Sequence, residues 1–274
     1  MSDELSDELS DELSDVLLIE RRADGIAVLT LNDPGRRNAM SDAMTAAWST
    51  AMSDLRTDKE LRCVVLTGAG SAFTSGGDLS WLADTNAEAV PALRDRMLEF
   101  YRTWLSVRTL EVPTIAAVNG HAVGAGLCLA LACDLRYAAT DAKLLAPFTA
   151  LGLHPGMAAT WLLPEVAGLP LAREMLLTGR ALTGTEAERY GLVNHAVPRD
   201  HVLTEALSAA ARIAARAPIA TRLTKVALSG GGHPDMESAL RWESLAQPVT
   251  MASDDMIEGI AAQRDKRLPR FTGA

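Results

Sequence analysis

The sequence predicts an α/β fold in which buried strands alternate with helices. Two short apolar runs rich in β-branched residues, Cys63–Leu66 and Thr114–Val118, are bounded by glycine, which indicates buried strands. Each run is followed by a glycine-rich turn and then by a segment with the helical spacing of apolar residues. Repeated strand-turn-helix units of this kind form an α/β fold with right-handed crossover connections.

An antiparallel pair of strands is expected before these units. Val16–Glu20 and Ile26–Leu31 flank Asp24-Gly25, a typical turn dipeptide. The pattern then breaks at Pro34, and Ser41 is a suitable N-cap for the helix that follows. The N-terminal part of the fold is therefore predicted as a hairpin, a loop and a helix.

The remaining chain is predicted to be mostly helical at its C-terminal end. A helix is expected over Pro91–Leu110, in which Trp104 is predicted to fill the core between helix and sheet. From about residue 200 no segment has the pattern of a strand, and glycine and proline separate four expected helices: Val202–Arg216, Pro218–Leu228, Met236–Gln247 and Ser253–Arg267. We therefore divide the chain into an extension (1–15), an α/β core (16–200) and a helical region (201–274).

Charge and composition exclude several classes of protein. The chain has 274 residues, 48% of them apolar, which supports one substantial core. The net charge is −9, but residues 1–15 hold seven acidic side chains and no basic one, so residues 16–274 carry only −2. We interpret 1–15 as a disordered acidic extension rather than a docked helix. No basic stripe indicates a nucleic-acid partner.

Cysteine usage and hydropathy indicate the compartment. The three cysteines, Cys63, Cys128 and Cys133, have no metal-binding spacing and read as reduced, buried thiols, so we expect no metal site. The N-terminus lacks the pattern of a signal peptide, and no apolar run approaches the ~20 residues that span a membrane. A cytoplasmic protein without a membrane partner is expected.

The two glycine-rich turns are the strongest functional signal. They lie within Thr67–Leu79 and Val118–Ala130, and each leads toward the start of a helix. Backbone N–H groups at a helix start have no partner within the helix, and the helix dipole favours negative charge there. Two such groups that converge on one point form an oxyanion hole, which stabilises a thioester enolate or a tetrahedral intermediate.

Both motifs resemble the signatures of a known family. Val64–Leu79 and Ile115–Asp134 are similar to the two signatures of the crotonase superfamily, also called the enoyl-CoA hydratase/isomerase family, and the resemblance extends over about Leu17–Phe271. It implies a spiral of ββα units and a C-terminal helical region that forms homotrimers or hexamers. It also implies that the N–H groups of Gly77 and Ala125 form the oxyanion hole, with a CoA thioester as substrate or ligand and no permanently bound cofactor.

The same resemblance suggests residues that bind CoA. It places Ser75, Gly77 and Leu79 of the first turn beside the ligand. Arg36 and Arg37 are expected near the CoA phosphates, where forked donors suit an anion, although an ordinary solvated basic pair is an equal alternative.

Lys266 is the C-terminal candidate for CoA binding. In the family, basic residues of the corresponding motif often approach a CoA phosphate. A lysine that interacts with the C-terminal end of a helix is the other interpretation, because cations are favoured there.

The residues expected around the acyl group are unusual. Relatives that hydrate a double bond use two glutamates, but the matching positions hold Cys128 and Phe148, and a third acid-base position used by some relatives holds Gly156. Trp81 is a further expected pocket residue. An inert thiol is the preferred interpretation of Cys128, and phenylalanine and glycine offer no proton. Hydration by two glutamates is therefore not expected.

His154 is the candidate for a relocated acid or base. Its unperturbed pKa lies near neutrality, and it precedes Gly156 by two residues. A histidine that only caps a loop is the alternative.

Two functions follow from these residues. The first is an acyl-CoA enzyme, a lyase or isomerase with non-standard acid-base groups, that stabilises a thioester enolate. The second is a non-catalytic acyl-CoA binding or carrier protein.

Overall fold

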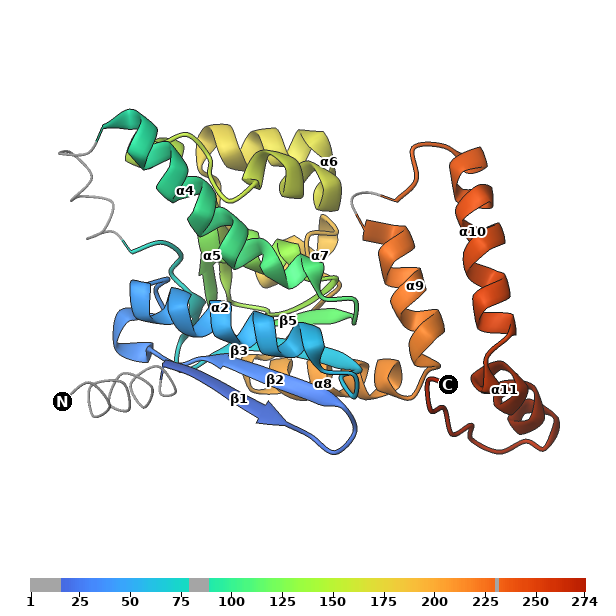
Figure 1. Cartoon of the computed structure of the whole chain (residues 1–274). Coiled ribbons are helices and arrows are strands. Elements are labelled where there is room, and N and C mark those ends of the chain that lie inside the picture. Colours follow the sequence, from blue (N-terminus) through green and yellow to red (C-terminus); the bar gives the residue numbers. More distant parts are fainter. Residues whose placement is uncertain (1–15, 79–88, 230–231) are drawn as a thin grey trace, which may run out of the picture.

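The computed structural model describes residues 16–78, 89–229 and 232–274, and consists of two sheets with helices around them (Figure 1). Leu79 and Trp81, both expected at the site, lie outside these ranges. The larger sheet has the order β1-β2-β3-β5-β7-β10. Its strands are Leu17–Arg21, Ile26–Leu31, Cys63–Gly68, Thr114–Val118, Leu135–Ala139 and His195–Val197. Within this larger sheet β1 and β2 pair antiparallel and the other neighbours pair parallel, so the predicted hairpin is confirmed.

The smaller sheet is made of very short strands. Its order is β4-β6-β8-β9, with the strands Ala72–Thr74, His121–Val123, Lys143–Leu145 and Leu182–Thr183. The three pairs β3/β4, β5/β6 and β7/β8 each place one strand in the larger sheet and the next in the smaller one. A helix follows each pair in the chain, namely α4, α5 and α6 in that order. This repeat of two strands and a helix is the expected spiral of ββα units.

Strands at the centre of the larger sheet are buried on both faces. All residues of β3 and β5 are buried, as is typical of parallel strands covered by helices. The helix α8 (Val202–Ala214) lies against β3, β5 and β7, so the first helix of the predicted C-terminal region packs on the core (Figure 1).

Helix α2 (Asp42–Thr57) shows how sequence patterning builds the core. The Ser41 hydroxyl accepts a hydrogen bond from the Met44 N–H (3.3 Å), which confirms the predicted N-cap. Buried residues recur every three or four positions along the helix. One of them, Trp48, stacks on Trp104 at 5.0 Å between ring centroids, and Trp104 is fully buried, as predicted.

The remaining α-helices include the three others predicted in the C-terminal region. They are α4 (Val90–Trp104), α5 (Ala125–Ala132), α6 (Ala159–Thr178), α7 (Gly184–Arg189), α9 (Pro218–Leu228), α10 (Met236–Met251) and α11 (Asp254–Arg264). Short 3₁₀ turns occupy Pro34–Arg36 (η1), Leu105–Thr109 (η3), Thr149–Leu151 (η4) and Arg199–His201 (η5). The helix predicted over 91–110 was too long, because α4 ends at Trp104 and η3 continues the chain.

Helices α10 and α11 lie farther from the two sheets than α9 does (Figure 1). Within the described ranges, no helix is both long and apolar enough to cross a bilayer.

Candidate functional site

The two glycine-rich turns meet where β4 pairs with β6. Thr74 lies opposite Ala122 in this parallel pair, so the turns that follow the two strands run side by side. A Cβ atom added to Gly76 would lie 3.1 Å from the Ala125 nitrogen and 3.2 Å from the Gly126 nitrogen. Gly76 also has a φ of +83°, a conformation that favours glycine. The close approach of the two backbones therefore requires glycine at position 76.

Both predicted donors have free N–H groups. The first turn is anchored through the Gly76 carbonyl, which accepts from the Met40 N–H (2.9 Å). Across residues 16–78, 89–229 and 232–274, no protein acceptor takes the N–H of Gly77 or of Ala125. Ala125 is the first residue of α5, and no side chain caps that end of the helix. Around Gly77 the space is open, since an added Cβ would meet nothing within 4 Å.

This geometry can stabilise negative charge on an oxygen atom. The two donors are backbone groups fixed by strand pairing and by the start of a helix, and such donors need no rearrangement when a charge develops. Gly77 and Ala125, predicted as partners from motifs about fifty residues apart, are brought to one place by the structure.

Asn38 supports the first turn, although sequence analysis missed it. Its buried side-chain amide donates to the carbonyls of Ala69 (2.9 Å), Ala72 (2.9 Å) and Phe73 (3.2 Å). The backbone carbonyl of Asn38 accepts from the Thr74 hydroxyl (2.6 Å). Asn38 has a φ of +55°, which asparagine tolerates better than most residues. In the sequence, the feature that could have pointed to Asn38 is its position directly after Pro-Gly-Arg-Arg.

The predicted CoA-binding residues of the N-terminal half lie together. The Ser75 N–H donates to the Arg37 carbonyl (2.9 Å), and the Ser75 hydroxyl to the Arg36 carbonyl (3.4 Å). Both arginines are exposed, and Arg36 forms an ion pair with Asp78. The loop is therefore adjacent to the first donor.

Lys266 lies elsewhere in the chain. It is exposed, follows α11 and has a φ of +55°. The loop that holds Arg36 and Arg37 directly precedes α2, and α11 lies at the opposite side of Figure 1 from the start of α2.

The expected acyl-pocket residues surround the first turns of α5. A Cβ added to Gly124 would lie 3.8 Å from the Phe148 ring. The Cys128 thiol lies 3.8 Å from the Gly156 carbonyl, which it can reach as a weak donor. A Cβ added to Gly156 would in turn lie 3.0 Å from Cζ of Tyr101. Phe148, Gly156 and, behind the Gly156 carbonyl, the fully buried Cys128 thus form one wall, and Tyr101, which the sequence analysis did not single out, belongs to it.

His154 is an exposed residue of the loop before Gly156. Its Nδ1 lies 2.8 Å from the Pro155 carbonyl oxygen. This contact supports the loop-capping alternative, since the ring is engaged with the adjacent backbone.

The Cys128 thiol is an unreactive group. Burial raises its pKa to about 12, and the same effect raises the pKa values of Cys63 and Cys133 to about 12. All three cysteines are buried and free, as predicted.

We expect none of the three thiols to react with a disulfide reagent at pH 8 while the protein is folded, because thiolate is the reactive form. All three should react after unfolding in guanidinium. One thiol that reacts rapidly and stoichiometrically in the native protein would contradict this expectation.

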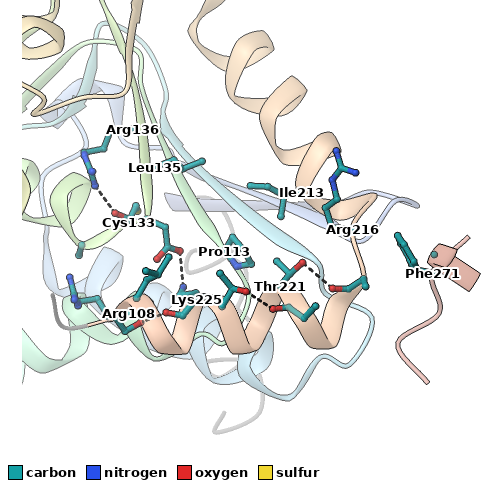
Figure 2. Close-up of a pocket in the computed structure, with 18 of the residues that line it drawn as sticks. Arg108, Pro113, Cys133, Leu135, Arg136, Ile213, Arg216, Thr221, Lys225 and Phe271 are labelled. Carbon is teal, nitrogen blue, oxygen red and sulfur yellow. Dashed lines mark hydrogen bonds and ion pairs between the residues drawn. The ribbon is translucent and has the colours of Figure 1, made fainter. Parts of the chain in front are cut away.

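The large cavity drawn in Figure 2 is separate from the donors. It has a volume of about 1050 Å³ and lies between the C-terminal end of α5, the helices α8 and α9, and the C-terminal tail. Lys225 pairs with Asp134 (2.9 Å) on its wall. Since α5 rises about 12 Å over its eight residues, the cavity is at the opposite end of this helix from Ala125.

Comparison with solved structures defines the class of fold. A crystal structure of an enoyl-CoA hydratase from Bacillus anthracis superposes with a TM-score of 0.89 at 33% identity, covering 94% of this chain and all (100%) of that one. An enoyl-CoA hydratase from Polaromonas sp. JS666 gives a TM-score of 0.87 at 32% identity, covering 93% and 99%. The fold is that of the crotonase superfamily.

Sequence comparison gives the family. The family model described as enoyl-CoA hydratase/isomerase matches residues 21–274, and the chain belongs to this family. The bovine enoyl-CoA hydratase domain-containing protein 2, a mitochondrial protein, is 39% identical over 254 residues, covering 91% of this chain and 85% of the bovine protein.

Proposed function

We propose that the protein binds acyl-CoA thioesters and stabilises the enolate of the thioester in an oxyanion hole formed by the N–H groups of Gly77 and Ala125. The observation that carries the proposal is the convergence of two turns that leave these donors free next to open space at Gly77. A thioester oxygen is the natural acceptor, because it gains charge when a proton or carboxylate leaves the adjacent carbon.

The proposed reaction differs from two-glutamate hydration. Cys128, Phe148 and Gly156 occupy the wall beside α5, and none of them can exchange a proton near neutral pH, given a Cys128 pKa of about 12. Isomerisation, decarboxylation or hydrolysis with an acid-base group from another position fits this wall better.

A non-catalytic acyl-CoA binding protein is the second candidate. The protonated thiol at position 128 and the apolar ring at position 148 favour it, since they leave the hole intact while they supply no acid or base.

One experiment separates these functions. The pure protein is titrated calorimetrically with crotonyl-CoA and with a long-chain acyl-CoA, and the same mixtures are then analysed for products. Binding with product formation supports the enzyme, and binding without product supports the carrier. If neither ligand binds, the proposal that the protein binds acyl-CoA is refuted.

We also propose that the protein assembles as a homotrimer or a pair of trimers. Helices α10 and α11 expose large apolar side chains, a pattern that favours burial against another copy: Leu240, Leu245, Val249, Met251, Ile257 and Ile260. A neighbouring copy could also bring its own Lys266 to the CoA phosphates, which one copy alone does not.

We expect light scattering to give a mass of three or six times 29.1 kDa. Replacement of Leu245, 72% exposed, by glutamate should dissociate the assembly, whereas replacement of the exposed Leu177 on α6 should not. A monomeric wild-type protein would contradict the assembly.

A further inference from the structure

The cavity drawn in Figure 2 has a positively charged lining. Its basic side chains are Arg108, Arg136, Arg216, Lys225 and Arg267, and its acidic ones are Asp134 and Glu165. With a volume of about 1050 Å³ it is as large as the pockets of ~300–1,000 Å³ that hold small ligands. An excess of positive charge in a cavity of this size favours an anionic occupant.

Three of these five basic side chains already have a carboxylate partner. The pairs are Lys225 with Asp134 (2.9 Å), Arg108 with Glu165 (3.6 Å) and Arg267 with Glu258 (2.6 Å). Among the residues that the structure describes, no carboxylate forms an ion pair with Arg136 or Arg216. The lining is therefore short of negative charge at these two arginines.

Arg136 is the buried member of the two. It belongs to β7 and is only 8% exposed. Its guanidinium donates to the backbone carbonyls of Leu192 (2.9 Å) and Cys133 (2.6 Å), which carry no net charge. Burial lowers the pKa of Arg136, because loss of water disfavours the charged form. A buried cation without a counter-charge is costly, and an anion in the cavity would offset this cost.

The wall that extends from Arg136 is apolar. Figure 2 shows Leu135 and Ile213 between Arg136 at one end and Phe271 at the other. Leu228 lines the same cavity and is 69% exposed. A hydrocarbon chain along this wall would remove apolar surface from water, which is favourable. The cavity thus combines one unpaired buried cation with an apolar surface.

We propose that this cavity is a binding site for an amphipathic monocarboxylate of the fatty-acid class, with the carboxylate at Arg136 and the hydrocarbon chain along Ile213 toward Phe271. A single carboxylate suits the site, because one buried cation lacks a partner. The site is separate from the proposed oxyanion hole, since the cavity is at the opposite end of α5 from Ala125. The inference does not depend on the thioester function proposed above.

The test titrates the full-length protein calorimetrically with decanoate, in the absence of any CoA ligand. Decan-1-ol has the same chain without the charge, and butyrate has the charge without the long chain. The wild type should bind one decanoate per chain, and each comparison ligand should bind more weakly by about tenfold or more. A charge-assisted hydrogen bond and the burial of several methylene groups each provide a factor of this size.

Two variants locate the ligand. Arg136→Gln should weaken the binding of decanoate by about tenfold or more and leave that of decan-1-ol unchanged. Arg94→Gln on α4, where the arginine side chain is 78% exposed, is the matched control and should behave as the wild type. Since Arg136 also holds two backbone carbonyls, a second variant avoids this position: Ala220→Phe places a ring in the cavity from α9 and should abolish the binding of both ligands.

Gly77→Pro should bind decanoate as the wild type does, because Gly77 belongs to the other site. Loss of decanoate binding in Gly77→Pro would overturn the proposal of a separate site. Unchanged affinity for decanoate in folded Arg136→Gln or Ala220→Phe, or equal affinity of the wild type for decanoate and decan-1-ol, would overturn the proposed ligand and its placement. A wild type that binds no decanoate would also overturn the proposal, and would leave the cavity to another occupant, such as a segment of a neighbouring copy.

Discussion

Gly77→Pro is expected to lower the rate of a thioester-dependent reaction by about 10²–10³-fold, equivalent to ~2.7–4 kcal/mol of transition-state stabilisation. Proline has no backbone N–H, so it removes one of the two proposed donors. The bond that anchors the turn, from the Met40 N–H to the Gly76 carbonyl, does not use the Gly77 nitrogen. Initial rates with a saturating thioester, or the affinity for crotonyl-CoA if no product forms, provide the measurement.

Gly77→Ala is the matched control. It retains the N–H, and its Cβ would meet nothing within 4 Å, so we expect a rate close to that of the wild type. An unchanged rate in the proline variant would exclude Gly77 from the mechanism. Equal losses in both variants would indicate a steric effect on ligand entry instead of a lost donor. Circular dichroism of the proline variant establishes that the turn change has not unfolded the protein.

The second large effect is expected on the stability of the fold, when the ion pair between Lys225 and Asp134 is broken. Lys225 has a side chain that is only 6% exposed, and its ammonium pairs with Asp134 (2.9 Å) and donates to the Val112 carbonyl (2.7 Å). The same Asp134 oxygen accepts from the N–H and the hydroxyl of Thr114, at 2.7 and 2.9 Å. Asp134 therefore connects α9 to the start of β5, on the wall of the cavity in Figure 2.

Asp134→Ala leaves the Lys225 ammonium buried without a counter-charge, and should lower the free energy of unfolding by about 3 kcal/mol. Chemical denaturation at a fixed protein concentration measures the change. Arg241→Ala is the control, because it breaks an exposed pair with Glu237 (77% and 66% exposed) that contributes about 0.5 kcal/mol or less. Similar losses in the two variants would refute a structural role for the pair of the buried Lys225 with the partly exposed Asp134.

Local patterns predicted most of the elements. The run Thr114–Val118 is bounded by proline and glycine, and β5 has these same ends. Helix α9 likewise matches Pro218–Leu228, because proline is favoured in the first helical turn. The smaller sheet could not be predicted as easily: β6 and β8 have three residues each, too few to show a periodic pattern.

The candidate site was predictable only in part. Gly77 and Ala125 belong to motifs with a local signature, and the structure brings them together. Tyr101 has no such signature, because its place beside Gly156 depends on how α4 packs in the folded chain. His154 was expected near the pocket from its distance in sequence, but sequence distance does not give the direction of a side chain, and its ring contacts the Pro155 carbonyl.

The proposed hole is made of main-chain groups, and this has a consequence for how the protein can change over evolutionary time. A point substitution at position 101, 128, 148 or 156 changes the wall beside the proposed acyl position, but it does not remove the N–H of Gly77 or of Ala125. The anchor for the thioester and the chemistry performed on it are thus encoded by separate sets of positions. One lineage can therefore exchange its acid-base groups, or lose them, while the ligand stays in place.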